Sequence, residues 1–304
     1  MPDAVEIMPG LRPGGMPREP SAPGLPGYER QLSWFHRAFE RELGAMVERL
    51  PLRRGMRVLD LACGDGFYTR RLAERVGKGG LVVGADSSLA YLSGCKASAP
   101  REPGRSTAGL VGAQFDHLPF PDDTFDLVWC AQSLYSLPDV GAAMASMARV
   151  LRPGGQVAVL ENDLLHHVIL PWPVALELPL RAAELRSFQA EDRSLGRSDV
   201  GRRLPAILAA AGLVPLRPTT HAFDRQAPLG VPERELLQTY LEDLLRRVST
   251  HVGPDLLGEL QQLVDPGSAR HLLRQPELSM TWLCVLALGR KGPLSAGASR
   301  AEPG

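Results

Sequence analysis

Two acidic residues and two glycines are spaced as in a site for a nucleotide-like ligand. Asp60 lies at the end of one apolar run, Gly64 and Gly66 follow it, and Asp86 ends the next apolar run. Glycines allow a tight turn that a residue with a Cβ makes only at a cost. Asp86 comes about 20 residues after the glycines, as does an acid that accepts hydrogen bonds from ribose hydroxyls. The alternative is that Asp86 only caps the following helix.

The residue types around the glycines disfavour a dinucleotide. A dinucleotide site has a third glycine, which lets helix and strand pack closely, and it places the pyrophosphate on the helix N-terminus. Here Thr69 occupies the third position, and the Asp60 carboxylate would repel a pyrophosphate. A carboxylate at this place favours a ligand that carries an ammonium group and no phosphate. S-adenosylmethionine is such a ligand.

The apolar runs around these residues predict an α/β fold with a parallel sheet. Strand-like and helical stretches alternate up to residue 163, a rhythm typical of βαβ units. We expect helices at 67–76 and from Pro138 to a stop at Pro153–Gly155, and strands at 56–61, 81–85, 110–113, 125–131, 156–160, 213–223 and 279–288. A helix over 28–50 precedes them, and its aromatic start could close over a ligand or pack on the sheet edge.

The composition predicts one globular domain with two tails. Residues 28–292 should form a single domain with helical insertions at about 164–212 and 231–275, and the proline- and glycine-rich residues 1–27 and the tail 293–304 should be disordered. The formal net charge of zero disfavours a nucleic-acid partner. No apolar run reaches the length of a membrane span, and the N-terminus lacks a signal-peptide pattern. Four scattered cysteines predict a cytoplasmic protein with reduced thiols and no zinc site.

Four motifs in order resemble those of class I S-adenosylmethionine-dependent methyltransferases, and most of all the group that includes the quinone-biosynthesis methyltransferases. The motifs are VLDLACGDG (58–66), GAD (84–86), LPFPDDTFD (118–126) and RVLRPGG (149–155). The resemblance covers about residues 30–163. It implies an α/β, doubly wound seven-stranded sheet of order 3-2-1-4-5-7-6 with strand 7 antiparallel. The late strand 279–288 would be that seventh strand, and the helical insertions would form an acceptor cap.

The resemblance also implies the residues that bind S-adenosyl-L-methionine as cofactor. They are Asp60, Ala62, Cys63, Gly64, Gly66, Asp86, Ser87, Gln114, Phe115 and Ala131. Asp60 and the glycine turn would contact the methionine moiety, and Asp86 the ribose. Relatives often have an acid at the position of Gln114, where it receives the adenine amino group. The amide carbonyl of glutamine can accept the same hydrogen bond.

Three residues are candidates for catalysis. Tyr135 stands where many relatives have a histidine, so it could orient the substrate or be a half-buried aromatic of the core. His166 and His167 follow the acidic end of the fifth strand, where side chains reach the ligand crevice. A histidine can remove a proton near neutral pH, but adjacent side chains on a helix point in different directions, so at most one of the two should serve. No spacing resembles a metal site.

The sequence therefore predicts an enzyme, a methyltransferase that moves a methyl group to an O, N or C atom of a small-molecule acceptor, such as a specialised metabolite, by in-line displacement. An NAD(P)-dependent reductase is one alternative, but no tyrosine has a lysine four residues later, as the short-chain reductases require. A non-catalytic S-adenosylmethionine-binding partner protein is the other. The expected partners are the acceptor and a possible second copy in a homodimer, without nucleic acid or membrane span.

Overall fold

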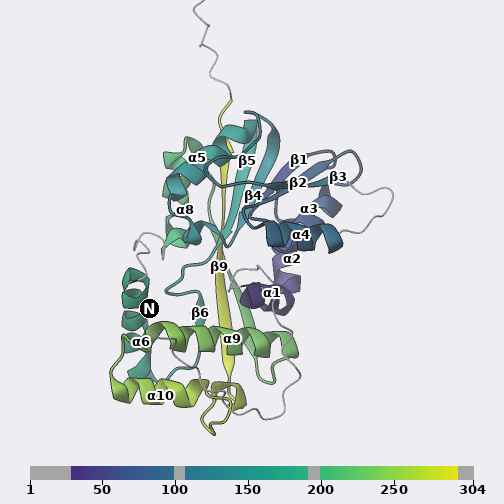
Figure 1. Ribbon diagram of the computed structural model, residues 1–304. Coiled ribbons are helices and arrows are strands. Elements are labelled where there is room, and N and C mark those ends of the chain that lie inside the picture. Colours follow the sequence, from purple (N-terminus) through teal and green to yellow (C-terminus); the bar gives the residue numbers. More distant parts are fainter. Residues whose placement is uncertain (1–28, 99–106, 191–198, 294–304) are drawn as a thin grey trace, which may run out of the picture.

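The strands of the protein form one mixed sheet in the computed structural model, which describes residues 29–98, 107–190 and 199–293 (Figure 1). The strands are β1 (Arg57–Leu61), β2 (Leu81–Asp86), β3 (Thr107–Gly112), β4 (Phe125–Ala131), β5 (Leu151–Glu161), β6 (Val168–Ile169), β7 (Leu213–Pro215), β8 (Thr219–Gln226) and β9 (Ser279–Lys291). Their order is β3-β2-β1-β4-β5-β9-β6, and β7 and β8 also pair with β9. β1 to β5 are parallel, and β9 is antiparallel to β5. The predicted doubly wound α/β fold is confirmed.

Strand β9 is longer than the sequence predicts and has four partners. Its 13 residues pair with β5 at one end and with β6 and β8 at the other. The single strand expected over 213–223 is two strands, β7 and β8, and both lie against β9. In Figure 1, β9 runs from the main sheet down into the helical part of the molecule.

Two strand boundaries also differ from the prediction. β5 begins at Leu151, so Pro153–Gly155, expected to be a turn that stops the helix, lies within the strand. Leu151 pairs with Phe125 before an irregularity in the register, which accommodates the proline and the left-handed Gly154 (φ 79°). β3 is Thr107–Gly112, so it begins three residues earlier and ends one residue earlier than the predicted strand 110–113.

The helices cover the sheet and extend beyond it. They are α1 (Glu29–Ala38), α2 (Glu40–Glu48), α3 (Phe67–Val76), α4 (Leu89–Ser98), α5 (Val140–Val150), α6 (Val174–Ala190), α8 (Val200–Ala210), α9 (Val231–Val248) and α10 (Pro254–Val264), with short helices η1 (Leu134–Ser136) and η2 (Leu272–Arg274). The helix expected over 28–50 breaks at Phe39 into α1 and α2. Asp139 caps α5, because its side chain accepts a hydrogen bond from the Ala142 N–H at 2.8 Å.

The two helical insertions do not form a single layer. α6, α9 and α10 pack together below the sheet, and we call these three helices the cap (Figure 1). α8 instead packs against α5, β5 and β9. Within the described ranges no helix is long and apolar enough to span a membrane. The expected tail 1–27 and all but the first residue of the expected tail 293–304 lie outside the described residues.

The two faces of the sheet bury different sets of side chains, as the alternation along each strand requires. Leu59, Leu61 and Val128 belong to one buried cluster, which includes the inner faces of α5 and α8. Val58 and Trp129 belong to the other, which includes α1, α2, α3 and the cap. Asp60 lies opposite Trp129 in the register, on this second face. The cap and α1 therefore cover the side of the sheet from which Asp60 projects.

Candidate active site

The predicted cofactor residues meet at one edge of the sheet. In the parallel register Asp60 pairs with Gly84 and Trp129, and Ala131 pairs with Leu160. The carboxyl ends of β1, β2, β4 and β5 thus lie side by side, which is where open α/β sheets bind their ligands. The segments that follow these ends supply the predicted contacts.

A left-handed backbone shapes the turn after β1. Gly64 and Gly66 have φ of 51° and 74°, values that glycine adopts without a steric cost. Ala62 has φ of 58° although it carries a Cβ, which stores strain at this position. The Cys63 N–H donates to the Ala85 carbonyl at 3.1 Å, and the Gly66 N–H donates to the Cys63 carbonyl at 2.8 Å. These bonds tie the glycine turn to the end of β2.

Asp86 is buried and contacts both the glycine turn and the start of α4. Its Oδ2 accepts a hydrogen bond from the Gly64 N–H at 2.9 Å, and its Oδ1 accepts one from the Ser88 N–H at 2.8 Å. Asp86 therefore caps the segment that leads into α4, which is the helix-capping role considered as an alternative to ribose binding. Because each carboxylate oxygen has two lone pairs, each can also accept a ribose hydroxyl. The two roles are compatible.

Asp60 is almost fully buried, with 1% of its surface exposed. Burial raises its pKa to about 7, a hydrogen bond from Thr69 acts in the opposite direction, and the nearby Asp86 and Asp65 carboxylates raise the pKa further. The Thr69 hydroxyl donates to Asp60 Oδ2 at 2.5 Å. Thr69, which stands where a dinucleotide site has its third glycine, thus positions the acid of β1. An ammonium group bound beside Asp60 would favour its ionised form.

The residues predicted at the adenine lie around the same edge, in more open positions. Ser87 and Gln114 are exposed and Phe115 is half-buried. The Ala113 N–H donates to the Asp86 carbonyl at 3.0 Å, which brings the segment after β3 beside Asp86. The buried acids and the turn fit the methionine and ribose parts of the ligand, and the exposed residues leave its base near solvent.

Helix α1 lies directly on the glycine turn, a contact that the sequence analysis missed. A Cβ placed on Gly64 would be 3.5 Å from Leu32 Cδ2. His36 Nδ1 lies 3.1 Å from Asp65 Oδ2, and its ring stacks on Phe67 with centroids 4.2 Å apart. Leu32 and His36 are four residues apart, so the sequence predicts that they share one helix face. It does not predict that this face contacts the glycine turn.

The polar side chains at the end of β5 make contacts within the protein and do not face an open crevice. Glu161 is fully buried and accepts hydrogen bonds from the N–H groups of Ser133 and Leu134, at 3.2 and 2.8 Å. Burial raises the pKa of Glu161 to about 7, and the backbone donors lower it. Asn162 Oδ1 lies 3.2 Å from Cys284 Sγ, and Asp163 pairs with Arg202. Glu161 thus fixes the segment after β4, which carries Tyr135.

The two adjacent histidines point in different directions, as expected. His167 is buried against Tyr240 and Trp282, and its Nδ1 lies 2.8 Å from the Leu164 carbonyl. Burial lowers its pKa to about 3, which makes its ring a poor base. His166 is exposed and lines a small cavity of about 310 Å³ beside Arg202 of α8. Tyr135 is half-buried in η1, just past the end of β4.

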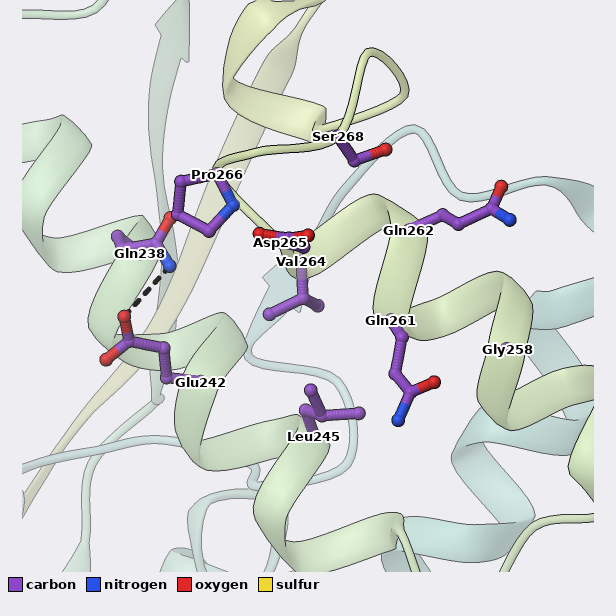
Figure 2. Close-up of a pocket in the computed structure, with 10 residues that line it drawn as sticks. All are labelled: Gln238, Glu242, Leu245, Gly258, Gln261, Gln262, Val264, Asp265, Pro266 and Ser268. Atoms are coloured by element: carbon purple, nitrogen blue, oxygen red, sulfur yellow. Dashed lines mark hydrogen bonds between the residues drawn. The ribbon is translucent and has the colours of Figure 1, made fainter. Parts of the chain in front are cut away.

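A cavity of about 630 Å³ lies in the cap, between α9 and α10 (Figure 2). Amide and carboxylate side chains lie among its lining residues, and on its α9 wall Gln238 Nε2 donates to Glu242 Oε1 at 3.0 Å. The residues predicted for the cofactor and for catalysis do not line it. Among the described residues no group of acidic, histidine or cysteine side chains could hold a metal ion.

Residues 59–159 match the methyltransferase domain family. This part of the chain is a class I S-adenosylmethionine-dependent methyltransferase domain, similar to that of the quinone-biosynthesis group. Its cofactor is S-adenosyl-L-methionine. The buried carboxylates Asp60 and Asp86, with the glycine turn between them, fit that ligand.

Relatives of this domain resemble only part of the chain. The ubiquinone/menaquinone biosynthesis C-methyltransferase UbiE of Idiomarina loihiensis is 42% identical over 130 residues, which is 42% of this chain and 49% of that protein. Methyltransferase GfsG of Streptomyces halstedii is 36% identical over 124 residues, 41% of this chain and 44% of that protein. The chain thus spans about half the length of the curated relatives it matches.

A solved structure shares the fold over a longer stretch. The YcgJ protein of Bacillus subtilis has a TM-score of 0.53 at 18% identity, and the similarity covers 83% of this chain and 99% of that one. At this identity the likeness concerns the fold alone.

Proposed function

We propose that the protein catalyses methyl transfer from S-adenosylmethionine to a small-molecule acceptor by in-line displacement. The observation that carries this proposal is the pair of buried carboxylates, Asp60 and Asp86, at the ends of neighbouring parallel strands on either side of the glycine turn. The bound cofactor supplies a methyl group already activated on a sulfonium. Asp60 receives the ammonium group, Asp86 the ribose hydroxyls, and α1 keeps water from the turn.

The acceptor region we propose is the buried aromatic cluster where α1, the cap and the cap end of β9 meet. Aromatic rings from these elements pack one against the next. The ring centroids of Phe35 and Trp282 are 5.1 Å apart, and those of Trp282 and Tyr240 are 6.0 Å apart. Such walls favour a flat or apolar small molecule, such as a specialised metabolite, over a nucleic acid. The net charge of zero agrees with this choice.

Among the residues predicted for catalysis, Tyr135 has the best support. It follows β4 directly, near Ala131, and buried Glu161 holds its segment in place. We propose that it positions the acceptor or the amino-acid end of the cofactor. His167 is disfavoured as a base by its low pKa, and the exposed His166 lies beside α8. A homodimer and a cytoplasmic location stay predictions. The described cysteines Cys63, Cys130 and Cys284 are all free, which agrees with the reduced thiols expected of a cytoplasmic protein.

Calorimetry tests the cofactor assignment. We expect the protein to bind S-adenosylmethionine, and Asp86→Ala to weaken binding by roughly ten- to a hundredfold, because charged hydrogen bonds are lost. Asp255→Asn, an exposed acid of α10, is the matched control and should bind as the wild type does. Tight NAD binding without S-adenosylmethionine binding would favour a reductase instead. A panel of small acceptors, assayed by mass for the gain of one methyl group, would then separate an enzyme from a non-catalytic binding protein.

A further inference from the structure

A buried histidine and an aspartate form a pair at the methionine end of the cofactor site. His36 of α1 is 5% exposed, and its Nδ1 lies 3.1 Å from Asp65 Oδ2 in the glycine turn. Burial alone would raise the pKa of Asp65, but the hydrogen bond and charge of His36 bring it below its usual value. Asp65 is therefore an ionised carboxylate that can only accept, so the hydrogen of the pair belongs to Nδ1 of His36. In the neutral form of the ring, which the proposed role requires, Nε2 then carries the lone pair.

The free nitrogen of His36 lies beside a second unpaired group. In the described part of the chain, His36 Nε2 and the Tyr68 hydroxyl are both buried and have no hydrogen-bond partner. The two rings are edge to face with centroids 5.5 Å apart. Buried polar atoms are rarely left unpaired without a reason, because a buried donor or acceptor without a partner destabilises the fold. Other buried polar atoms of the described residues also lack a partner, but these two belong to rings in contact beside the glycine turn, where one polar group of a ligand could pair with both.

The orientation of His36 is fixed by its neighbours. Its ring stacks on Phe67 at an interplanar angle of 14°, and the Arg71 guanidinium lies 3.7 Å from the Phe67 ring centroid. Asp65 is itself held, since its Oδ1 accepts from the Phe67 N–H at 2.9 Å and its carbonyl accepts from Arg70. A carboxylate that orients an imidazole through Nδ1 and leaves Nε2 free is the arrangement of a general base.

The pair lies at the glycine turn, beside the residues proposed for the methionine end of the cofactor. Asp65 belongs to the turn between Cys63 and Gly66, and Tyr68 faces Asp60 closely enough that the acid raises the pKa of the phenol, after burial and the effect of Cys284. We propose that His36, oriented by Asp65, is the general base that takes the proton from a hydroxyl group of the acceptor, and that the Tyr68 hydroxyl binds the same group. This inference rests on the proposed function.

The proposed step transfers the methyl group to the acceptor oxygen and the hydroxyl proton to His36. The acceptor oxygen forms a bond to the methyl carbon while the carbon–sulfur bond breaks, and that electron pair stays on sulfur. The hydroxyl proton moves to His36 Nε2, and Asp65 stabilises the resulting imidazolium. The proton passes to water when the product leaves. Nε2 of His36 is buried between α1 and the glycine turn, so the acceptor enters only when α1 moves from the turn, and the pair with Asp65 forms again when the helix returns. The Arg30–Glu235 ion pair at 2.9 Å joins α1 to α9.

Nitrogen NMR of histidine tests the proton position without any turnover. In protein labelled with ¹⁵N-histidine and saturated with S-adenosylmethionine, we expect His36 to carry its proton on Nδ1 and none on Nε2. His36→Asn identifies the signals by their loss. Asp65→Asn should move the proton to Nε2, because the amide then donates to Nδ1. A proton on Nε2 in the wild type would overturn the proposal.

A series of phenols tests the chemical role. His36→Asn keeps a donor for Asp65 but has no base, so methylation of phenol should fall by about a hundredfold or more. The defect should shrink for 4-nitrophenol, which is already largely ionised at about pH 8 and needs no base. A loss of packing would affect both phenols equally. Arg37→Gln, an exposed residue of the same helix, is the control and should keep both rates.

The outcomes separate this inference from the proposed function. Calorimetry on His36→Asn should give an affinity for S-adenosylmethionine close to that of the wild type. A wild type that does not bind the cofactor would contradict the proposed function itself. Cofactor binding without methylation of any phenol, or a His36→Asn variant that loses both phenols to the same extent, would overturn only the role of His36.

Discussion

At the scale of single residues, two buried acids link the stability of the fold to pH. Burial raises the pKa of Asp60 and of Glu161 to about 7, from ordinary values of 3.8 and 4.5. The folded protein therefore binds more protons than the unfolded chain between about pH 4 and pH 7. The contribution of these groups is fully present below their ordinary values and is lost as the pH rises through about 7.

We predict that Asp60→Asn flattens this pH dependence. The amide stays neutral at every pH, so the free energy of unfolding should fall less between about pH 5 and pH 8 than in the wild type. Urea denaturation of the cofactor-free protein at both pH values measures the difference. Asp255→Asn serves as the control and should keep the full fall. If Asp60→Asn and the wild type lose the same free energy, Asp60 is ionised well below pH 7 in the folded protein.

At the scale of elements, Arg225 of β8 joins three parts of the molecule. Its guanidinium pairs with Glu42 of α2 at 2.7 Å and with Glu233 of α9 at 3.2 Å, and it also bonds to the Ala38 carbonyl at the end of α1. It lies over the Phe39 ring as well, 4.7 Å from the centroid. The break between α1 and α2 at Phe39 is thus held by a strand that is almost two hundred residues away in the chain.

We predict that Arg225→Ala destabilises the fold by about 1–2 kcal/mol, because it leaves two partly buried carboxylates without their partner. Arg246→Ala offers a matched control: Arg246 also pairs with an acid, but its side chain is 69% exposed. Its loss should change the stability by less than about 0.5 kcal/mol. Chemical denaturation compares the two variants. Equal effects would mean that the Arg225 contacts contribute no more than an ordinary surface pair.

The sequence predicts elements whose signals are local and misses those that depend on distant partners. β4 and α3 are found at their observed bounds because apolar spacing and glycines mark them. The roles predicted for Asp60 and Asp86 follow from their places at strand ends. By contrast, nothing near His36 indicates Asp65, and the start of β5 depends on a pairing with Phe125 that overrides a proline and two glycines. Glu161 lies at the expected strand end, but only the folded segment after β4 shows that its side chain is already used.

At the scale of the whole molecule, β9 connects the cap to the cofactor domain. Residues 285–290 of β9 pair with β5, and residues 279–286 pair with β8. Trp282 of this strand packs on Tyr240 of α9, whereas Trp129 of β4 lies in the main sheet and pairs with β1 and β5. Because one continuous strand belongs to both parts, we expect them to unfold together.

A single substitution in the cap tests this coupling. Glu184 of α6 is fully buried and pairs with Arg181 at 2.7 Å and Arg247 at 3.5 Å. Glu184→Gln leaves two largely buried arginines with less charge compensation, so we predict a loss of about 3–5 kcal/mol. With 5-fluorotryptophan incorporated, ¹⁹F NMR reports the unfolding of Trp129 and Trp282 separately, and both midpoints should fall by the same amount. A shift confined to Trp282 would mean that the cap unfolds as an independent unit, and β9 would then have to fray at its cap end while its pairing with β5 stays intact.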